Sequence, residues 1–302
     1  MKKTICCIGS RGFIGNQIYE QLKNSETYEI FRYSSEKNQF IDQCNLEKFD
    51  YLIFSAGVHN ESQNDDKNIF YQTKKIFKDT RKIFINSNSI IYISSFKTCF
   101  NTNKKIIKST NKYNFYKFDN NYGKSKIIFE KLFIKFCLNF KKEYMIVCPS
   151  HVIGPNDIKY SANGKFFDNI LKKRIIIFPN CNISVIDVRN LAQIVKNIIL
   201  KKKFHNSKII ANDLSLPIED YIKHIKANKK NYIQIKMNLF FIRLLFILNK
   251  FLIKIKFTKK DIISKTRLEY IKMNPQTEIT NLKKDFSFDK TIFDTRNFFL
   301  KK

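Results

Sequence analysis

Residues 4–15 read TICCIGSRGFIG, an apolar run that leads directly into three glycines. The apolar part, residues 4–8, is typical of a strand buried on both faces of a sheet. The residues that follow fall at the spacing of one helical face: Ile14, Ile18 and Leu22. A strand, a glycine turn and a helix in this order can bind a dinucleotide pyrophosphate at the helix N-terminus. The sequence therefore predicts an α/β fold, a Rossmann-type doubly wound parallel sheet.

The second strand is expected at residues 28–32, and it ends in Arg32. An acidic residue there would hold the ribose 2′-hydroxyl of NAD. Two guanidinium groups, Arg32 and the loop residue Arg11, instead suit the 2′-phosphate of NADP(H). NADP(H) is therefore the preferred cofactor, and NAD(H) remains open because Glu36 is a rival acid in the polar loop beyond. Two solvated arginines are the alternative interpretation.

Two further buried strands are expected at residues 50–57 and 90–95. The first ends in small residues, so a cofactor can lie against the backbone at Ala56. The second ends in Ser94-Ser95. Ligands of an open parallel sheet bind beyond the carboxyl ends of its strands, where Ser95 can hydrogen-bond a substrate oxygen. Serines in this position also serve as simple turn residues.

A helical run opens at Tyr122-Gly123-Lys124-Ser125-Lys126 and continues with apolar residues. Tyr122 and Lys126 are four apart and so share one helical face. A neighbouring positive charge lowers the pKa of tyrosine from its usual value of about 10. Tyr122 can then exchange protons with a hydroxyl or carbonyl near neutral pH. Alone, the pair is more typical of a surface helix.

The rest of the chain supports two interleaved domains. In order, we expect a helix at about 68–84, a polar loop at 101–121, strands at 144–149, 183–188 and 208–211, and a helix at 190–200. From about Pro217 the chain is helical, rich in lysine and without glycine. We therefore predict a sheet domain of residues 1–155 and 182–213. A smaller, mostly helical substrate domain would comprise residues 156–181 and 214–302.

Residues 239–257 are very apolar, but Arg243, Lys250, Lys254 and Lys256 interrupt them. They fall short of the roughly 20 apolar residues that a membrane span needs, so no span is expected. An amphipathic helix on a membrane surface remains open. A helix packed in the core is the favoured interpretation.

The chain of 302 residues carries a formal net charge of +30, from 56 Lys and Arg against 26 Asp and Glu. This would raise nucleic acid or an anionic membrane as partners. The excess is mostly lysine spread along the chain, alongside many Ile, Asn, Phe and Tyr, so a bias toward A/T-rich codons is the simpler explanation. We expect no specific nucleic-acid partner, although a positive field favours an anionic substrate or cofactor.

The seven cysteines show neither a CxxC pair nor a regular spacing. Cys6, Cys7 and Cys148 lie in apolar runs, where small buried thiols are expected. The first eight residues, MKKTICCI, lead straight into the glycines without a cleavage site, which indicates a strand and not a signal peptide. These features predict a reduced, cytoplasmic protein with no disulfide framework and no metal site.

Jointly, these motifs resemble the extended short-chain dehydrogenase/reductase superfamily and, within it, the NAD(P)-dependent nucleotide-sugar epimerase/dehydratase family. The resemblance runs along nearly the whole chain and is clear over about the first two hundred residues. Its motifs are the glycine loop at 9–15, the strand ending at Ala56, Ser94-Ser95, Tyr122-Gly123-Lys124-Ser125-Lys126 with Glu130, Val152-Ile153-Gly154-Pro155 and Val185-Ile186-Asp187-Val188.

The resemblance implies a role for each matching residue. Tyr122 would be the catalytic acid and base, Lys126 would bind the nicotinamide ribose, and Ser95 would orient the substrate oxygen. The residues expected to contact the cofactor are Gly9, Arg11, Gly12, Phe13, Ile14, Gly15, Arg32, Ala56 and Lys126. The glycine loop with its internal arginine looks like that of GDP-fucose synthase and related reductases. Dimers are usual in this family, so a homodimer is an open expectation.

Some segments depart from the family pattern. Phe96-Lys97 stand where family dehydratases carry an Asp-Glu pair, which argues against sugar dehydration. Cys148-Pro149-Ser150-His151 replace the usual Arg-Pro-x-Asn segment, so its substrate contacts do not carry over, and His151 receives no catalytic role. The connection at residues 40–49 is shorter than usual, which leaves recognition of the adenine open.

We therefore predict an NAD(P)-dependent oxidoreductase acting on a nucleotide-activated sugar, with NADPH-dependent reduction of a keto-sugar preferred. A nucleotide-sugar epimerase that retains its cofactor would use the same residues. A non-catalytic Rossmann scaffold that binds nucleic acid or a membrane surface is the rival from another class. The tyrosine and lysine pair counts against the scaffold, because binding alone does not use a tuned phenol.

Overall fold

A six-stranded parallel sheet forms the centre of the molecule. The computed structural model describes residues 2–33, 48–57, 66–100, 106–109, 121–227, 231–255, 257–258, 265–274, 276–280 and 284–301. The strands, in spatial order, are β2 (Tyr28–Tyr33), β1 (Lys3–Ile8), β3 (Phe49–Phe54), β4 (Ser87–Ile93), β6 (Glu143–Pro149) and β10 (Ser207–Ala211). All neighbouring pairs are parallel.

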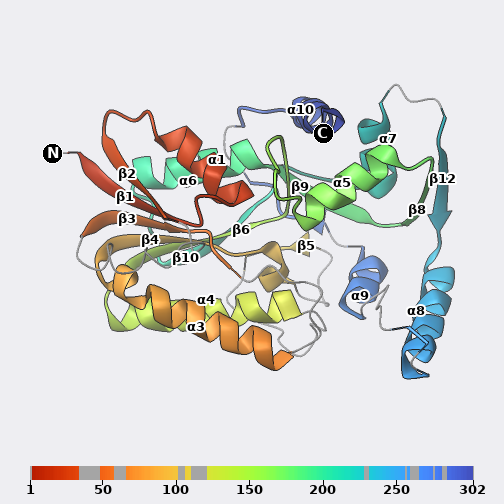
Figure 1. Ribbon diagram of the computed structural model, residues 1–302, viewed down its shortest axis with the longest axis horizontal. Helices are drawn as coiled ribbons and strands as arrows, with labels where there is room; N and C mark the ends of the chain where they lie inside the picture. The colour runs from red at the N-terminus through yellow and green to blue at the C-terminus, as the bar shows by residue number, and fades with distance from the viewer. Residues whose placement is uncertain are drawn as a thin grey trace.

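Helices cover both faces of this sheet, as Figure 1 shows. On one face lie α3 (Asp66–Ile85) and α4 (Asn121–Asn139), and on the other lie α1 (Phe13–Leu22) and α6 (Val188–Leu200). This arrangement confirms the predicted Rossmann-type α/β fold. The predicted strand at 208–211 is the edge of the sheet, paired with β6.

The two-sided burial explains why the strands are continuously apolar. In β1, Cys6 and Ile8 enter the apolar core beneath α3 and α4, whereas Ile5 and Cys7 enter the core beneath α1 and α6. Successive strand residues point to opposite faces, so a strand covered on both sides needs an apolar residue at each position. The cysteines described here are buried thiols, as expected, and Cys44 lies outside the described residues.

The strand order creates a crevice at the carboxyl edge of the sheet. From β1 the chain moves to β2 on one side, and then returns to β3 on the other side of β1. Connections that leave in opposite directions open a crevice beyond these strand ends, and such switch points bind ligands in open α/β sheets. The glycine loop follows β1 at this point, and residues 55–57 follow β3.

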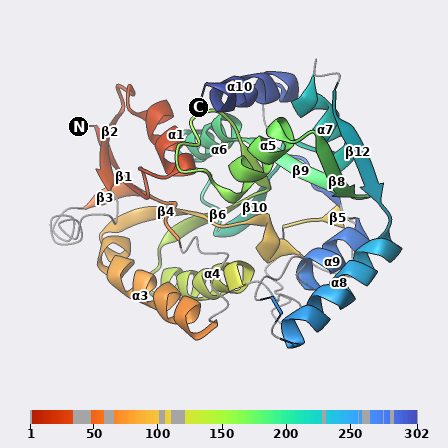
Figure 2. The ribbon, with the colours of Figure 1, turned by 45° about the vertical axis from the view of Figure 1, so that its right-hand side comes forward.

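Smaller sheets extend the molecule beyond this edge. They are β11–β9–β7 (Leu214–Pro217, Asn182–Asp187 and His151–Ile153), β8–β12 (Ile175–Pro179 and Ile233–Met237) and β5–β13 (Ile106–Ile107 and Gln276–Thr277). Figure 2 shows this part at its right-hand side. A third apolar core, around Phe167, Tyr221 and Phe299, joins α5 (Ala162–Lys172), α7 (Ile218–Lys226) and α10 (Phe288–Leu300). Residues after Pro217 thus contain short strands besides the predicted helices, because β12 and β13 pair with segments far back in the chain.

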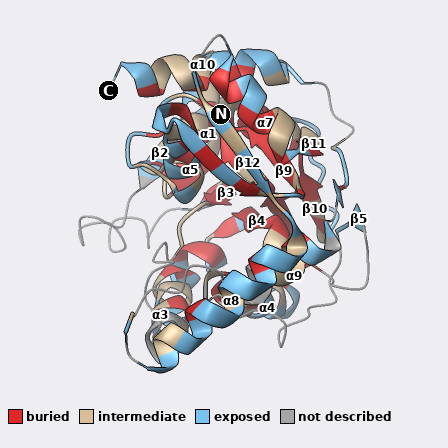
Figure 3. Ribbon diagram, turned by 90° about the vertical axis from the view of Figure 1, so that its right-hand side faces the viewer, coloured by how far each residue is buried: buried red, intermediate tan, exposed pale blue. Residues whose placement is uncertain are grey.

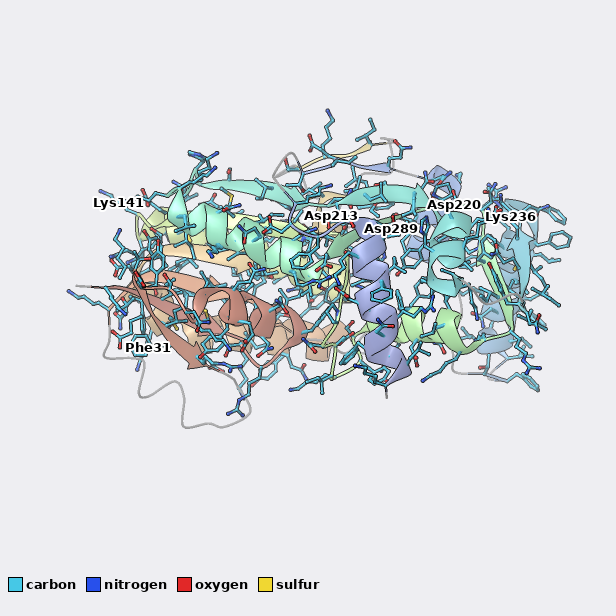
Figure 4. The ribbon with its side chains drawn as sticks, turned by 90° about the horizontal axis from the view of Figure 1, so that it is seen from above. Phe31, Lys141, Asp213, Asp220, Lys236 and Asp289 are labelled. Carbon is cyan, nitrogen blue, oxygen red and sulfur yellow. The ribbon has the colours of Figure 1, made fainter. Side chains whose placement is uncertain are left out.

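A polar cluster attaches α10 to the sheet domain. Asp187 caps α6 by accepting from the backbone N–H of Arg189 at 2.6 Å. The Arg189 guanidinium bridges Asp187 at 2.7 Å and Asp294 of α10 at 2.6 Å. Nearby, Asn190 donates to Asp213 at 2.8 Å, and Figure 4 shows Asp213 beside α10. The Asp187 segment, which the sequence marked as a family motif, therefore contributes to structure here.

Helix α8 (Leu239–Lys254) differs from its predicted role. The favoured interpretation of residues 239–257 as a core helix is wrong, because Ile242 and Asn249 are the only residues of α8 that are buried. Phe240 is 69% exposed and Ile247 is 62% exposed. The sequence misled because apolar residues cover most of the surface of this helix, so periodicity could not identify an inward face. Among the described residues, no helix has the length and apolarity to cross a bilayer.

Candidate functional site

The glycine loop is shaped by close contact with the end of β3. Gly9 has a φ of +83°, a conformation that favours glycine. A Cβ on Gly9 would lie 2.7 Å from Ser55 Oγ, and one on Gly15 would lie 2.6 Å from the same oxygen. Gly12 is the N-cap of α1 and makes no side-chain capping bond. The N–H groups of the first turn of α1 are therefore suited to an anion.

Arg32 lies against the start of α1. Its Nη2 donates to the carbonyl oxygen of Ser10 and to Oδ1 of Asn16, each at 2.9 Å. Its guanidinium carbon is 4.1 Å from the centre of the Tyr19 ring. The arginine at the end of β2 is thus held beside the glycine loop. Arg11 is exposed in the loop itself, and Glu36 lies outside the described residues.

A cleft opens between the end of β3 and the first turns of α4. The cleft is lined by Ala56, Gly57, Thr73, Ile76, Tyr92, Ser125, Lys126 and Phe129. Of these, the sequence predicted Ala56 and Lys126 as site residues. Gly57 and Tyr92 stand in the predicted strands, but only the packing of α4 against the sheet shows that they form the cleft.

Lys126 is buried in the wall of this cleft. Its Nζ donates to the carbonyl oxygen of Ile93 at 3.3 Å and lies 5.2 Å from the centre of the Tyr92 ring. A Cβ on Gly57 would be 3.1 Å from the same nitrogen. The absence of a side chain at Gly57 therefore lets the ammonium group reach the cleft.

Burial makes Lys126 an unusual lysine. Desolvation lowers its pKa to about 8, against the opposing influence of Glu130 and then Cys148. Charged amines lose hydration when they are buried, so the neutral form is favoured. Lys126 can therefore be protonated or neutral close to neutral pH, as a group in proton-transfer chemistry requires.

Tyr122 lies on the first turn of α4 between two lysines. The centre of its ring is 5.9 Å from Lys126 Nζ and 5.1 Å from Lys97 Nζ. Tyr122 and Lys126 are therefore neighbours on α4, as their spacing of four residues predicts. Lys97 was not predicted as a site residue, because the sequence analysis identified it only as a departure from the dehydratase pattern.

Ser95 stands at the carboxyl end of β4, where the short helix η1 (Phe96–Cys99) begins. Its Oγ accepts from the backbone N–H of Lys97 at 3.3 Å. Two residues before Ser95, the carbonyl oxygen of Ile93 accepts from Lys126. Two residues after Ser95, the side chain of Lys97 lies against the Tyr122 ring. Helix η1 also packs against α4. The structure therefore brings the three predicted catalytic residues into one region, with Ser95 also capping η1.

A buried ion pair lies beneath this region. Glu130, one turn after Lys126, accepts from the Ser94 hydroxyl and pairs with Lys208 at 2.7 Å. Burial alone would lower the pKa of Lys208, but Cys148 and Glu130 more than offset this, and the pKa is raised. The sequence contained no signal for this pair, because 78 positions separate its members. The pair fixes α4 to β4 and β10, and so supports the helix that carries Tyr122 and Lys126.

These residues fit a nicotinamide dinucleotide. An added Cβ at Gly9 or Gly15 would collide with Ser55, so both positions need glycine. No side chain caps the first turn of α1, so its backbone N–H groups can bind a phosphate. Lys126 reaches the other end of the crevice past Gly57. The turn is suited to the pyrophosphate of such a cofactor, and the buried lysine is suited to its nicotinamide ribose.

Several solved structures of other proteins share this fold. No curated protein matches the sequence significantly. A nucleoside-diphosphate-sugar epimerase from Pseudomonas aeruginosa has a similar structure, with a TM-score of 0.72, 13% identity and coverage of 100% of this chain and 98% of that one. RMD from Pseudomonas aeruginosa, complexed with NADPH, aligns with a TM-score of 0.67 at 11% identity, over 98% of this chain and 99% of that one.

UDP-glucuronic acid 4-epimerase from Bacillus cereus, in complex with NAD, gives a TM-score of 0.69 at 11% identity and covers 99% of both chains. At such low identities these similarities show the fold alone. The profile of the NAD dependent epimerase/dehydratase family, however, matches residues 5–203. That match spans well over half of the sequence and includes the glycine loop, Ser95, Tyr122 and Lys126. The chain belongs to the NAD dependent epimerase/dehydratase family.

Proposed function

We propose that this protein is an NADPH-dependent reductase that acts on the keto group of a nucleotide-activated sugar. The observation that carries the proposal is the position of Lys126, which is buried between Gly57 and Tyr92 and stands beside the Tyr122 ring. A lysine whose pKa is lowered to about 8 next to a phenol is suited to proton transfer. Such a pair serves chemistry at a hydroxyl or carbonyl carbon.

The chain's own residues would hold the cofactor along the crevice. The backbone of Gly9, Arg11 and Gly12 and the first turn of α1, with Phe13, Ile14 and Gly15, would bind the pyrophosphate. Ala56 would lie against the cofactor, and Lys126 would donate to the nicotinamide ribose. The bound nicotinamide supplies hydride transfer to or from the sugar carbon.

The catalytic residues then move and hold the proton. Tyr122 donates its phenol proton to the carbonyl oxygen during reduction and accepts a proton from the hydroxyl in the reverse direction. The ammonium groups of Lys126 and Lys97 favour the phenolate that remains after donation. The Ser95 hydroxyl, at the end of β4, donates to the same substrate oxygen and orients it. The low-dielectric surroundings of Lys126 strengthen these interactions.

The preference for NADPH rests on Arg32 and Arg11. Arg32 is held by Ser10 and Asn16 beside the glycine loop, where a 2′-phosphate would meet its guanidinium group. Arg11 is exposed in the same loop and can reach toward it. RMD, a structural neighbour, is complexed with NADPH and another neighbour with NAD, so the neighbours support a nicotinamide cofactor of either kind.

A substrate domain of residues 156–181 and 214–302 completes the proposed organisation. The third apolar core joins α5, α7 and α10 from these two segments. Strands β8 and β12, one from each segment, pair with each other. These contacts support a unit built from both segments, whose core also contains Ile153, Ile183 and Val185 of the sheet-domain segments.

Epimerisation of a nucleotide sugar is the second candidate. Two structural neighbours are described as nucleotide-sugar epimerases, one of them in complex with NAD. An epimerase would use Tyr122 in the same way but would retain its cofactor through the reaction. Cofactor retention therefore separates the two candidates.

Calorimetric binding of NADPH and NADH tests the proposal. We expect NADPH to bind the wild type more tightly, and Arg32→Gln to weaken NADPH binding by roughly tenfold, because it removes a charged hydrogen-bond donor. Arg174→Gln, an exposed arginine between α5 and β8, is the matched control. Purified protein would then be screened for NADPH oxidation with keto-sugar nucleotides. A preference for NADH, or a cofactor that cannot be removed, would favour the epimerase, and no binding of either would refute both.

A further inference from the structure

Helix α8 exposes a broad apolar face. Its buried residues, Ile242 and Asn249, are seven positions apart and lie on one side of the helix. The rest of the helix surface carries large apolar residues, each at least 45% exposed: Phe240, Phe241, Leu244, Leu245, Ile247, Leu248 and Phe251. In Figure 3, α8 runs across the front of the molecule and is coloured as exposed along most of its length.

The ribbon of β8 and β12 continues this surface. Ile233 pairs with Ile175 and Ile235 pairs with Ile177, and all four side chains are between 45% and 60% exposed. The alternate β8 residues Ile176 and Phe178 are buried. An exposed strand face is normally polar, so four neighbouring isoleucines require a partner.

These two groups together form what we term the apolar strip, namely the seven residues of α8 and the four isoleucines. Strand β12 leads into α8 through the N-cap residue Asn238. Figures 1 and 2 show both elements along the same side of the molecule, at the far end from β2. Exposed apolar surface of this kind marks an interaction site.

Positive charge accompanies the apolar strip. Arg243, Lys250 and Lys254 recur on one flank of α8, beside its apolar face, and all three are exposed. Between residues 221 and 260 the sequence contains eleven Lys and Arg and neither Asp nor Glu. A helix with an apolar face and a cationic flank is suited to lie in the headgroup region of an anionic bilayer.

We propose that the apolar strip docks this protein onto an anionic lipid surface. The apolar residues of α8 enter the boundary between headgroups and acyl chains, while Arg243, Lys250 and Lys254 contact lipid phosphates. Helix α8 has 16 residues and so lies in the plane of the surface instead of crossing it. Pairing with a second copy is less favourable, because it brings two acid-free cationic segments together in a chain of net charge +30.

Sedimentation with vesicles tests this inference. The wild-type protein is mixed with phosphatidylcholine vesicles, with or without about 30% phosphatidylserine. We expect it to sediment with the anionic vesicles and much less with the neutral ones. Leu244→Gln/Phe251→Gln should weaken binding by about 100-fold, since each removes an apolar side chain from the bilayer. Arg243→Gln/Lys254→Gln should weaken it by about 25-fold and reduce the preference for phosphatidylserine.

A matched variant controls for the general effect of polar substitutions. Leu138→Gln/Phe293→Gln replaces residues that are 64% and 58% exposed on α4 and α10, and it should bind vesicles like the wild type. The proposal fails if the wild type stays in solution with both vesicles. It also fails if Leu244→Gln/Phe251→Gln binds anionic vesicles as tightly as the wild type, since overall charge would then explain the binding. Conversion of a dimer to a monomer by that variant, with vesicle binding unchanged, would assign the strip to a second copy.

Discussion

Helices α4 and α8 are both rich in apolar residues and in lysine, but they lie in opposite surroundings. On α4, Ile127 and Phe133 are fully buried against the sheet, and Lys126 is buried with them. On α8, apolar residues such as Phe251 face outward beside exposed lysines. Helix α4 packs against the sheet, whereas α8 is buried only along the side that carries Ile242 and Asn249.

The chemical behaviour of a lysine in this protein depends on its surroundings. Burial lowers the pKa of Lys126 to about 8, and this makes it a partner for Tyr122. The exposed lysines of α8 remain hydrated and act as surface charges. Three experiments test whether the two helices differ in this way.

The largest effect is expected at the reacting phenol. Tyr122→Phe removes the proton donor and should lower kcat by about 1,000-fold, whereas NADPH affinity should change by less than about twofold. Steady-state kinetics and calorimetry measure the two quantities. Tyr71→Phe, at a 68% exposed position on α3, is the control and should leave both unchanged. If Tyr122→Phe keeps wild-type turnover, the phenol of Tyr122 is not the proton donor.

A matched pair of phenylalanines tests the packing difference. Phe133→Ala should reduce the free energy of unfolding by about 4 kcal/mol, because it leaves a cavity in the core. Phe251→Ala should change it by less than about 0.5 kcal/mol, because the side chain is already 57% exposed. Urea unfolding of both variants gives the comparison. Equal losses would show that α8 is packed in solution and would contradict its exposed face.

The smallest effect concerns the charge of Lys126. Its pKa is about 8 in the folded chain against 10.5 normally, so between these values the unfolded state binds more protons and wild-type stability rises with pH. At pH 7 the wild type carries the full cost of the buried charge. Lys126→Met should therefore be more stable there, by roughly 1–3 kcal/mol, and inactive.

This advantage should shrink as the pH rises from about 8 and disappear above 10.5, where Lys126 is neutral in both states. Denaturant unfolding across this range measures it. Lys135→Met, an exposed lysine on the same helix, should show no such pH dependence. If the difference in unfolding free energy between Lys126→Met and the wild type does not change with pH, the pKa of Lys126 is not shifted by folding.

Much of the sheet domain could be predicted from sequence because its signals are local. A strand covered on both faces must be apolar at each position, as in β1, and a tight strand-to-helix turn needs glycine at Gly9 and Gly15. The spacing of Tyr122 and Lys126 follows from helical geometry alone. The site residues were therefore predicted from motifs, and their roles await the experiments above.

Local sequence specifies the order of the elements, the glycine turn and the helix that carries Tyr122 and Lys126, since each depends on neighbours within a few residues. The pairing of Glu130 with Lys208 and the nearness of Gly57 to Lys126 depend on the folded arrangement, since these contacts join distant segments. The exposure of α8 depends on it as well. An apolar sequence favours burial but does not specify what covers it, and that depends on where the rest of the chain lies.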